Sequence, residues 1–449
     1  MNFTVDNQTF KDLNIFDERS NSVFQMFKST RTVGARERLR EMMLKPSADV
    51  KELTLRRDAI QFFHDRKLVL DIRNEELDLI EFYLKSDKRK SKANLIDGVA
   101  DYLTRNSSND FYIIRTGLKY LIKLAKYILG FIEDNLSQET PEYLTELFEK
   151  IASIADNGLL KEAVLCDEDK LRFLKINKLD QSFRGKEKKN MYIFLQLVYE
   201  LDVFEGLAYV ATAKGFTFPI YDTSNTLRFN LKGLFHPAIT NAVKNDVIFT
   251  ENQNIVFLTG SNMAGKSSLL KSLGLAVYLA HLGFPVPAEA MSTTIFNGLI
   301  TTINLPDDIN NGLSHYYSEV KRVKEVSEKL VEKDKILVIF DELFRGTNVK
   351  DAYDASLLII SELTAVTKAA FFISTHIVEL ADELKKYKNI SFHCLETFFK
   401  DGKPVFTHKL TEGVSKERLG MFIVLNEGIV EAIRNAAGKI TNDLYQTPK

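Results

Sequence analysis

Apolar residues recur every three to four positions through most of residues 1–213, where glycine and proline are sparse. This spacing is typical of amphipathic helices. The pattern is clearest in four stretches, which we predict as helices: 36–44, 53–64, 118–132 and 192–212. The most apolar of them, 118–132, carries Lys119, Lys123 and Lys126 on one face, which indicates a packing helix rather than a membrane-spanning one. We therefore predict an all-helical domain over residues 1–213.

The pattern changes near Gly215, where short runs of β-branched and aromatic residues begin to alternate with helical stretches. Four such runs are predicted strands: 255–259, 336–340, 370–374 and 390–395. Alternation of strand and helix favours a mostly parallel sheet with helices on both faces. Residues 214–449 are accordingly predicted to form a second, α/β domain.

Composition narrows the possible classes of protein. The chain has 449 residues, 45% of them hydrophobic, and a formal net charge of −1, so any surface that attracts nucleic acid must be local. A basic run at 85–92 is either such a surface, gripping DNA phosphates, or a solvated turn. Cys166 and Cys394 lack metal-ligand spacing, and the first residues lack a signal-peptide pattern. We expect a cytoplasmic protein with no membrane partner.

The strongest chemical motif is a glycine-rich loop between a predicted strand and a predicted helix. Its eight residues match the phosphate-binding pattern G-x-x-x-x-G-K-[ST]: Gly260, Ser261, Asn262, Met263, Ala264, Gly265, Lys266 and Ser267. Backbone N–H groups of such a loop wrap an anion, and the helix that opens at Ser268 adds a partial positive charge. We expect Lys266 to reach the outer phosphates of ATP and Ser267 to hold Mg²⁺.

Two further strand ends supply titratable groups. Asp341 and Glu342 follow the apolar run 336–340, at the end of a strand where α/β sheets bind ligands. Asp341 is a candidate Mg²⁺ ligand, and Glu342 a candidate base that orients or deprotonates the attacking water. His376 ends another strand and is a candidate partner of the γ-phosphate or of that water, although a strand-end histidine taken alone is more often structural.

Several of these stretches together resemble the MutS family of DNA mismatch repair ATPases. The loop resembles the ATP loop of that family, including its Asn262-Met263 pair. The resemblance continues upstream and downstream over most of the chain, in residues 32–40, 57–60, 233–237, 283–288, 307–314, 341–347, 375–380 and 410–415. It is most specific in the ATPase half.

The resemblance implies an ABC-like P-loop ATPase domain preceded by an all-α core or lever domain, working as a homodimer. In that arrangement each ATP lies between the P-loop of one subunit and the signature serine of the other, which here is Ser314. Asn262 would belong to the nucleotide pocket. Three residues would belong to the dimer-facing loop after the acidic pair: Arg345, Thr347 and Asp351. Helical levers would connect the ATPase sites to DNA.

The chain also departs from the family pattern. It begins at the helical core, so we expect no mismatch-reading domain, no connector domain and no intrinsic mismatch reading. The aromatic residue that stacks on adenine in the family is replaced near its place by Ala242 or Val243. The predicted function is a slow, Mg²⁺-dependent ATPase that drives a clamp on duplex or branched DNA in mismatch repair or related recombination, with a repair protein as a possible partner. Two alternatives remain: a nucleotide-switched protein-interaction module that does not bind DNA, and, more remotely, a transporter ATPase.

Overall fold

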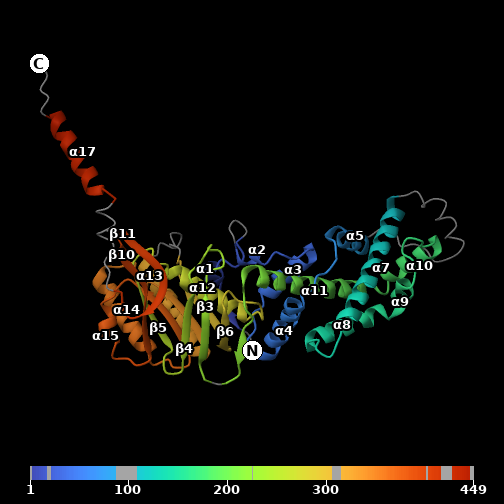
Figure 1. Ribbon diagram of the computed structural model, residues 1–449, viewed down its shortest axis with the longest axis horizontal. Helices are drawn as coiled ribbons and strands as arrows, with labels where there is room; N and C mark the ends of the chain where they lie inside the picture. The colour runs from blue at the N-terminus through green and yellow to red at the C-terminus, as the bar shows by residue number, and fades with distance from the viewer. Residues whose placement is uncertain are drawn as a thin grey trace, which may run out of the picture. The chain divides into compact units, whose positions relative to one another are not determined.

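A computed structural model describes residues 3–17, 22–86, 109–224, 226–305, 315–400, 403–415 and 427–444. The chain divides into two compact units, each made of segments that are separate in sequence (Figure 1). One unit comprises residues 1–14, 220–278 and 287–449, and the other comprises 15–219 and 279–286. The first fourteen residues therefore belong with the α/β half of the chain. The predicted residues Ser314 and 87–92 lie outside the described residues.

The unit formed by residues 15–219 and 279–286 is helical in its described part, and we call it the helical unit; the other is the α/β unit. The helices of the helical unit are α2 (Val23–Met26), α3 (Val33–Met43), α4 (Val50–Arg66), α5 (Asn74–Lys85), α7 (Asn109–Asn135), α8 (Glu142–Ala155), α9 (Gly158–Val164), α10 (Phe173–Phe183) and α11 (Lys188–Lys214). The long helix α11 contacts both α3 and α4, and α5 packs along α7. None of the described helices is long and apolar enough to cross a membrane.

Buried acidic groups on α11 fasten the start of α3. Asp202 is fully buried and accepts hydrogen bonds from the backbone N–H groups of Arg31 and Thr32, at 2.9 and 3.0 Å, and from the Thr32 hydroxyl at 2.7 Å. One turn on, Glu205 forms an ion pair with Arg31 at 2.7 Å. Thr32 itself caps α3 by accepting from the Ala35 N–H. Polar pairing inside the unit thus determines where α3 begins.

The other unit is built on a seven-stranded sheet in the order β1-β7-β8-β9-β5-β10-β11. These strands are β1 (Thr4–Val5), β7 (Gly298–Thr302), β8 (Ile336–Asp341), β9 (Ala370–Thr375), β5 (Ile255–Thr259), β10 (Ile390–Lys400) and β11 (Lys403–Glu412). Neighbours pair in parallel except β11, which is antiparallel to β10. The prediction of an α/β fold with a mostly parallel sheet is confirmed.

Helices cover both faces of this sheet. One face packs on α13 (His315–Glu332), α14 (Val349–Leu363) and α15 (Leu380–Leu384), around alternate buried residues such as Phe257, Val338 and Ile373. On the other face lies α12 (Lys266–Ala280), where a Cβ added to Gly274 would stand 2.8 Å from Leu13 and 3.4 Å from Ile339. Strands buried on both sides explain the continuous apolar runs in the sequence.

A smaller, four-stranded sheet has the order β2-β6-β3-β4. It contains β2 (Ile220–Asp222), β6 (Ala290–Thr294), β3 (Arg228–Leu234) and β4 (Asn245–Thr250). Phe249 of β4 packs edge to face on Phe372 of β9, with ring centroids 6.3 Å apart, so the small sheet covers part of the large one. Among its described residues, the unit also contains α1 (Asn7–Asp12) and α17 (Ile429–Leu444).

Candidate functional site

Three neighbouring parallel strands bring those predicted site residues that the structure describes to one place, at the carboxyl ends of the strands. The glycine-rich loop follows β5, Asp341 and Glu342 end or follow β8, and His376 follows β9. Because β9 lies between β8 and β5, its last residues stand between the loop and the acidic pair. Carboxyl ends of parallel strands are the usual ligand sites of α/β folds.

The loop joins β5 to α12 with three residues of positive φ: Gly260 at 159°, Met263 at 71° and Gly265 at 100°. A Cβ at Gly265 would stand only 3.1 Å from the His408 ring, so the position requires glycine on two counts. Asn262 and Met263 are exposed, whereas Ala264 and Lys266 are buried. His408 of β11 supports the loop from outside, because its Nδ1 lies 2.9 Å from the carbonyl oxygen of Ala264.

Lys266 points its ammonium group back across the mouth of the loop. Its Nζ donates to the carbonyl oxygens of Gly260 and Ser261, at 2.8 and 3.3 Å, and lies 3.3 Å from both ring nitrogens of His376. Burial lowers the pKa of Lys266, and the charges of Glu342 and Asp341 oppose that shift. A cation held this way is ready to exchange carbonyl partners for an anionic ligand.

His376 connects Lys266 to the acidic pair. Its Nε2 lies 2.5 Å from Oε1 of Glu342. With the proton on Nε2, the ring donates to Glu342, and Nδ1 accepts from Lys266. The hydrogen bond from His376 lowers the pKa of Glu342; burial acts in the opposite direction, and the charges of Lys266 and Arg345 lower the pKa further. Glu342 is therefore held as a carboxylate, the form that accepts a proton.

Asp341 receives hydroxyl groups from both neighbouring segments. Ser267 donates to Oδ2 at 2.6 Å, and Ser374, fully buried on β9, donates to Oδ1. The ladder register sets this second contact, because Asp341 and Ser374 are directly paired between β8 and β9. A serine hydroxyl and a carboxylate at this separation are hard oxygen ligands of the kind that Mg²⁺ prefers. Among the described residues there is no group of three or more His, Cys, Asp or Glu side chains able to hold a metal by themselves.

The backbone after Asp341 turns through left-handed conformations at two bulky residues, Glu342 with φ 58° and Phe344 with φ 60°. Such conformations are unfavourable for residues other than glycine and occur most often at functional sites. Arg345 follows, with its guanidinium 3.8 Å from Glu342 and 3.9 Å from the buried Glu319 of α13. Thr347 is half-buried and Asp351 exposed.

A pocket of about 370 Å³ opens beside the loop. Its walls come from residues 234–245, from the loop and the start of α12, and from Leu395 and His408. They include Ala242 and Val243, the positions near which the family resemblance would place an adenine-stacking aromatic residue. Ser268 also lines it. Sequence reasoning missed the contributions of His408 and Ser374; Ser374 stands just before the Thr375-His376 pair, whereas nothing local marks His408.

The chain contains an α/β unit whose glycine-rich loop, acidic pair and histidine lie together at the carboxyl ends of three parallel strands. Comparison with known proteins identifies its family. The family model for MutS domain III matches residues 8–334, and that for MutS domain V matches residues 256–445. The chain belongs to the MutS family.

Individual relatives agree with the family models. The chain is 30% identical over 328 residues to the DNA mismatch repair protein MutS of Anaplasma phagocytophilum, an alignment that covers 70% of this chain and 39% of the relative. It is 28% identical to MutS of Shouchella clausii, over 56% of this chain and 29% of the relative, and 30% identical to MutS of Thermotoga petrophila, over 56% and 32%. The chain thus spans less than two fifths of the length of these relatives.

Proposed function

We propose that this protein binds ATP in its glycine-rich loop, hydrolyses it slowly with Mg²⁺, and uses the cycle to control a clamp on DNA in mismatch repair or related recombination. The observation that carries the proposal is the chain of contacts from Lys266 through His376 to Glu342. This series of contacts joins the cation proposed to bind phosphate to the carboxylate proposed as the base, at the carboxyl ends of the strands. Membership of the MutS family and the names of the curated relatives support the DNA repair role.

Each residue has a distinct task in this scheme. Lys266 binds the outer phosphates and neutralises charge that develops on them. Glu342 orients the attacking water and accepts its proton as the bond from the water oxygen to the γ-phosphorus forms and the bond from that phosphorus to the leaving ADP breaks. His376 holds Glu342 in position and is itself a candidate contact of the γ-phosphate. The backbone N–H groups of residues 260–268 receive the remaining phosphate oxygens.

Mg²⁺ would be held by Ser267 and Asp341, and when bound it supplies charge neutralisation on the phosphate oxygens. The two side chains fit this task because they already share a hydrogen bond and carry only oxygen donors. Ser374 keeps the Asp341 carboxylate in one orientation. The pocket beside the loop has room for a nucleobase, and its aromatic lining residues are Phe235, His236 and His408.

We further propose a homodimer in which Ser314 completes the site of the partner's nucleotide, with Arg345, Thr347 and Asp351 near the subunit boundary. This step rests on the family resemblance. The test is the mass of the Glu342→Gln variant by sedimentation, with and without ATP and Mg²⁺. A nucleotide-dependent dimer that Ser314→Arg prevents supports the composite site, and a mass that does not respond to ATP contradicts it.

The ATP site is tested by equilibrium binding of a fluorescent ATP analogue to parent, Lys266→Ala and Lys368→Ala. Lys368 is exposed just before β9, at the end of the sheet away from the loop, where it pairs with Asp334 at 2.9 Å, so it serves as the matched control. Loss of a charge-assisted phosphate contact should weaken binding by about 1.5–3 kcal/mol in Lys266→Ala only. Equal binding by all three proteins would contradict the assignment.

We propose that DNA is read through its backbone and shape rather than through a mismatch. The matched models are those of domains III and V, whereas the family resemblance assigns mismatch reading to a separate domain. Gel-shift titrations with homoduplex, single-mismatch and four-way-junction DNA should give affinities for the first two within about threefold. Affinity should fall steeply with salt. Absence of DNA binding at low salt would favour the protein-interaction module instead.

A further inference from the structure

The first described residues form a bracket on the α/β unit. Strand β1 adds to the edge of the large sheet in parallel with β7, pairing Thr4 with Gly298 and Val5 with Leu299. Helix α1 follows immediately and packs along β7, and Asp6 caps it by accepting from the Thr9 N–H at 2.8 Å. We call residues 3–13 the N-terminal bracket. Of its carboxylates, Asp12 binds residues at and beyond the end of β7, and Asp6 acts on the end of β7 through Arg322.

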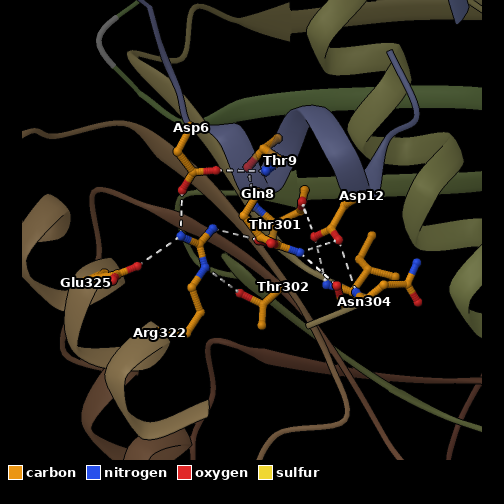
Figure 2. Close-up of polar contacts among 10 residues, drawn as sticks. Asp6, Gln8, Thr9, Asp12, Thr301, Thr302, Asn304, Arg322 and Glu325 are labelled. Carbon is orange, nitrogen blue, oxygen red and sulfur yellow. Dashed lines mark hydrogen bonds and ion pairs between the residues drawn. The ribbon is translucent and has the colours of Figure 1, made fainter. Parts of the chain in front are cut away.

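Asp12 is the anchor of the bracket and is 1% exposed. Its Oδ2 accepts from the Thr301 hydroxyl at 2.7 Å and from the Ile303 N–H at 2.9 Å, and its Oδ1 accepts from the Asn304 N–H at 3.1 Å (Figure 2). Gln8 donates to Asp12 at 2.8 Å and to the carbonyl oxygen of Asn304, also at 2.8 Å. Strand β7 ends at Thr302, so the bracket supplies the hydrogen-bond partners of the residues just beyond the sheet.

Asp6 acts on the opposite side of the same segment through Arg322 of α13, which is 7% exposed. The guanidinium lies 2.6 Å from Asp6, and it donates to the carbonyl oxygen of Thr301 at 2.8 Å and to the Thr302 hydroxyl at 3.3 Å (Figure 2). Glu325, one turn along α13, lies 3.4 Å from the same group. Bracket, β7 end and α13 are thereby joined in one polar network.

The segment held in this way borders the candidate catalytic residues. Thr302, Ile303 and Leu305 form one wall of a small cavity, α13 forms a second, and residues 341–345 form the third. The cavity measures about 10 Å³, which is room for one water molecule. Glu319 on the α13 wall accepts from the Gly346 N–H at 3.2 Å, so the loop after Glu342 is fastened to α13 as well.

We propose that Asp12 is a positioning residue for ATP hydrolysis: by holding Ile303 and Asn304 it fixes the wall against which Glu342 and its loop are placed. The inference rests on the proposed function. Asp12 does not touch the loop that binds phosphate, and Lys266, Ser267 and His376 make their contacts without it. Its effect is therefore confined to the hydrolytic step and does not extend to nucleotide binding.

The test compares kcat for ATP, the Kd of a fluorescent ATP analogue and the Tm of the full chain in Asp12→Asn, Thr301→Val and the double variant. Asp12→Asn replaces one accepting carboxylate oxygen with an NH2 group, which can only donate. Thr301→Val removes a single hydroxyl donor at nearly constant volume. We expect kcat to fall about tenfold or more in Asp12→Asn, because small misplacements of catalytic groups carry costs of this size. The Kd should stay within about twofold, and the two substitutions should be non-additive in kcat because they break one shared bond.

Phe229→Leu is the control for lost stability, since Phe229 is buried in the small sheet of the same unit. If Asp12→Asn lowers kcat no more than Phe229→Leu does at equal loss of Tm, the role is structural and the proposal is wrong. If Asp12→Asn does not fold, an unchanged kcat in Thr301→Val overturns the proposal and a selective fall supports it. A parent that hydrolyses no ATP would instead overturn the proposed function, whose ATP-binding step the Lys266→Ala comparison tests independently.

Discussion

Ser374→Ala separates metal binding from the rest of the ATP site. Ser374 is fully buried, and its hydroxyl group donates a hydrogen bond to the carboxylate of Asp341. Removing its hydroxyl leaves Ser267 as the remaining hydroxyl partner of the carboxylate. Groups that orient a metal ligand typically contribute a factor of 10–100 in metal affinity or activity. Loss of a hydrogen bond to a charged group costs about 1.5–3 kcal/mol, which corresponds to a similar factor in affinity.

We therefore expect the Mg²⁺ concentration for half-maximal ATP hydrolysis to rise about tenfold or more in Ser374→Ala, while binding of the ATP analogue without metal stays close to the parent. The assay is steady-state phosphate release against free Mg²⁺ at saturating ATP. Ser391→Ala is the matched control, because Ser391 donates to the backbone carbonyl of Ile255 at 3.2 Å on a neighbouring strand. Unchanged Mg²⁺ dependence in Ser374→Ala, or an equal shift in the control, would refute the assignment of Asp341 as the metal ligand.

Three further predictions concern stability. Asn254→Ala should lower the free energy of unfolding in urea by roughly 2–4 kcal/mol, because this fully buried amide donates to the carbonyl groups of Val366 and Ala369 and accepts from Asn389. A loss below about 0.5 kcal/mol, the size expected for a surface substitution, would contradict this. Asp202→Asn should cost about 1–2 kcal/mol and lower protection of the α3 start in hydrogen exchange, and unchanged protection there would contradict the anchoring role. Burial raises the pKa of Asp6, but the hydrogen bond and charge of Arg322 and bonds from Thr9 outweigh it, so the net shift is downward. Ionised Asp6 thus stabilises the fold above its unfolded pKa of about 3.9, and this contribution is lost as the pH falls through the lower pKa of the folded state. The Tm of Asp6→Asn should therefore decline less steeply with acid than that of the parent, and parallel curves of Tm against pH would refute this.

The core of the site was predictable from local pattern. Three apolar runs, each followed by chemistry-bearing residues, place those residues at one edge if the strands are parallel, and β5, β8 and β9 are parallel. The glycine-rich loop and its helix also carry their own signals. Most of the predicted helix and strand ends lie within a few residues of the observed ends. Differences of this size are expected because helix ends fray and caps are not sharply defined.

Other features depend on contacts that no local pattern records. Residues 3–14 contact β7 almost 300 positions away, through a two-residue strand and buried polar side chains, so the apolar periodicity gave no indication that they belong to the α/β unit. The same holds for residues 279–286, which group with the helical unit although they comprise the last residues of α12 and those just after it. His408 reaches the loop only because β11 pairs back along β10.

The most direct test of the ATPase site is hydrolysis by Glu342→Gln beside Glu383→Gln, an exposed control on α15, each at saturating ATP and Mg²⁺. Glutamine keeps the size of the side chain but cannot accept the proton of the attacking water. We predict that Glu342→Gln binds the ATP analogue within about threefold of the parent and releases phosphate at least about a hundredfold more slowly, as expected for loss of a general base. Phosphate release by Glu342→Gln at the rate of the parent and of Glu383→Gln would contradict the account.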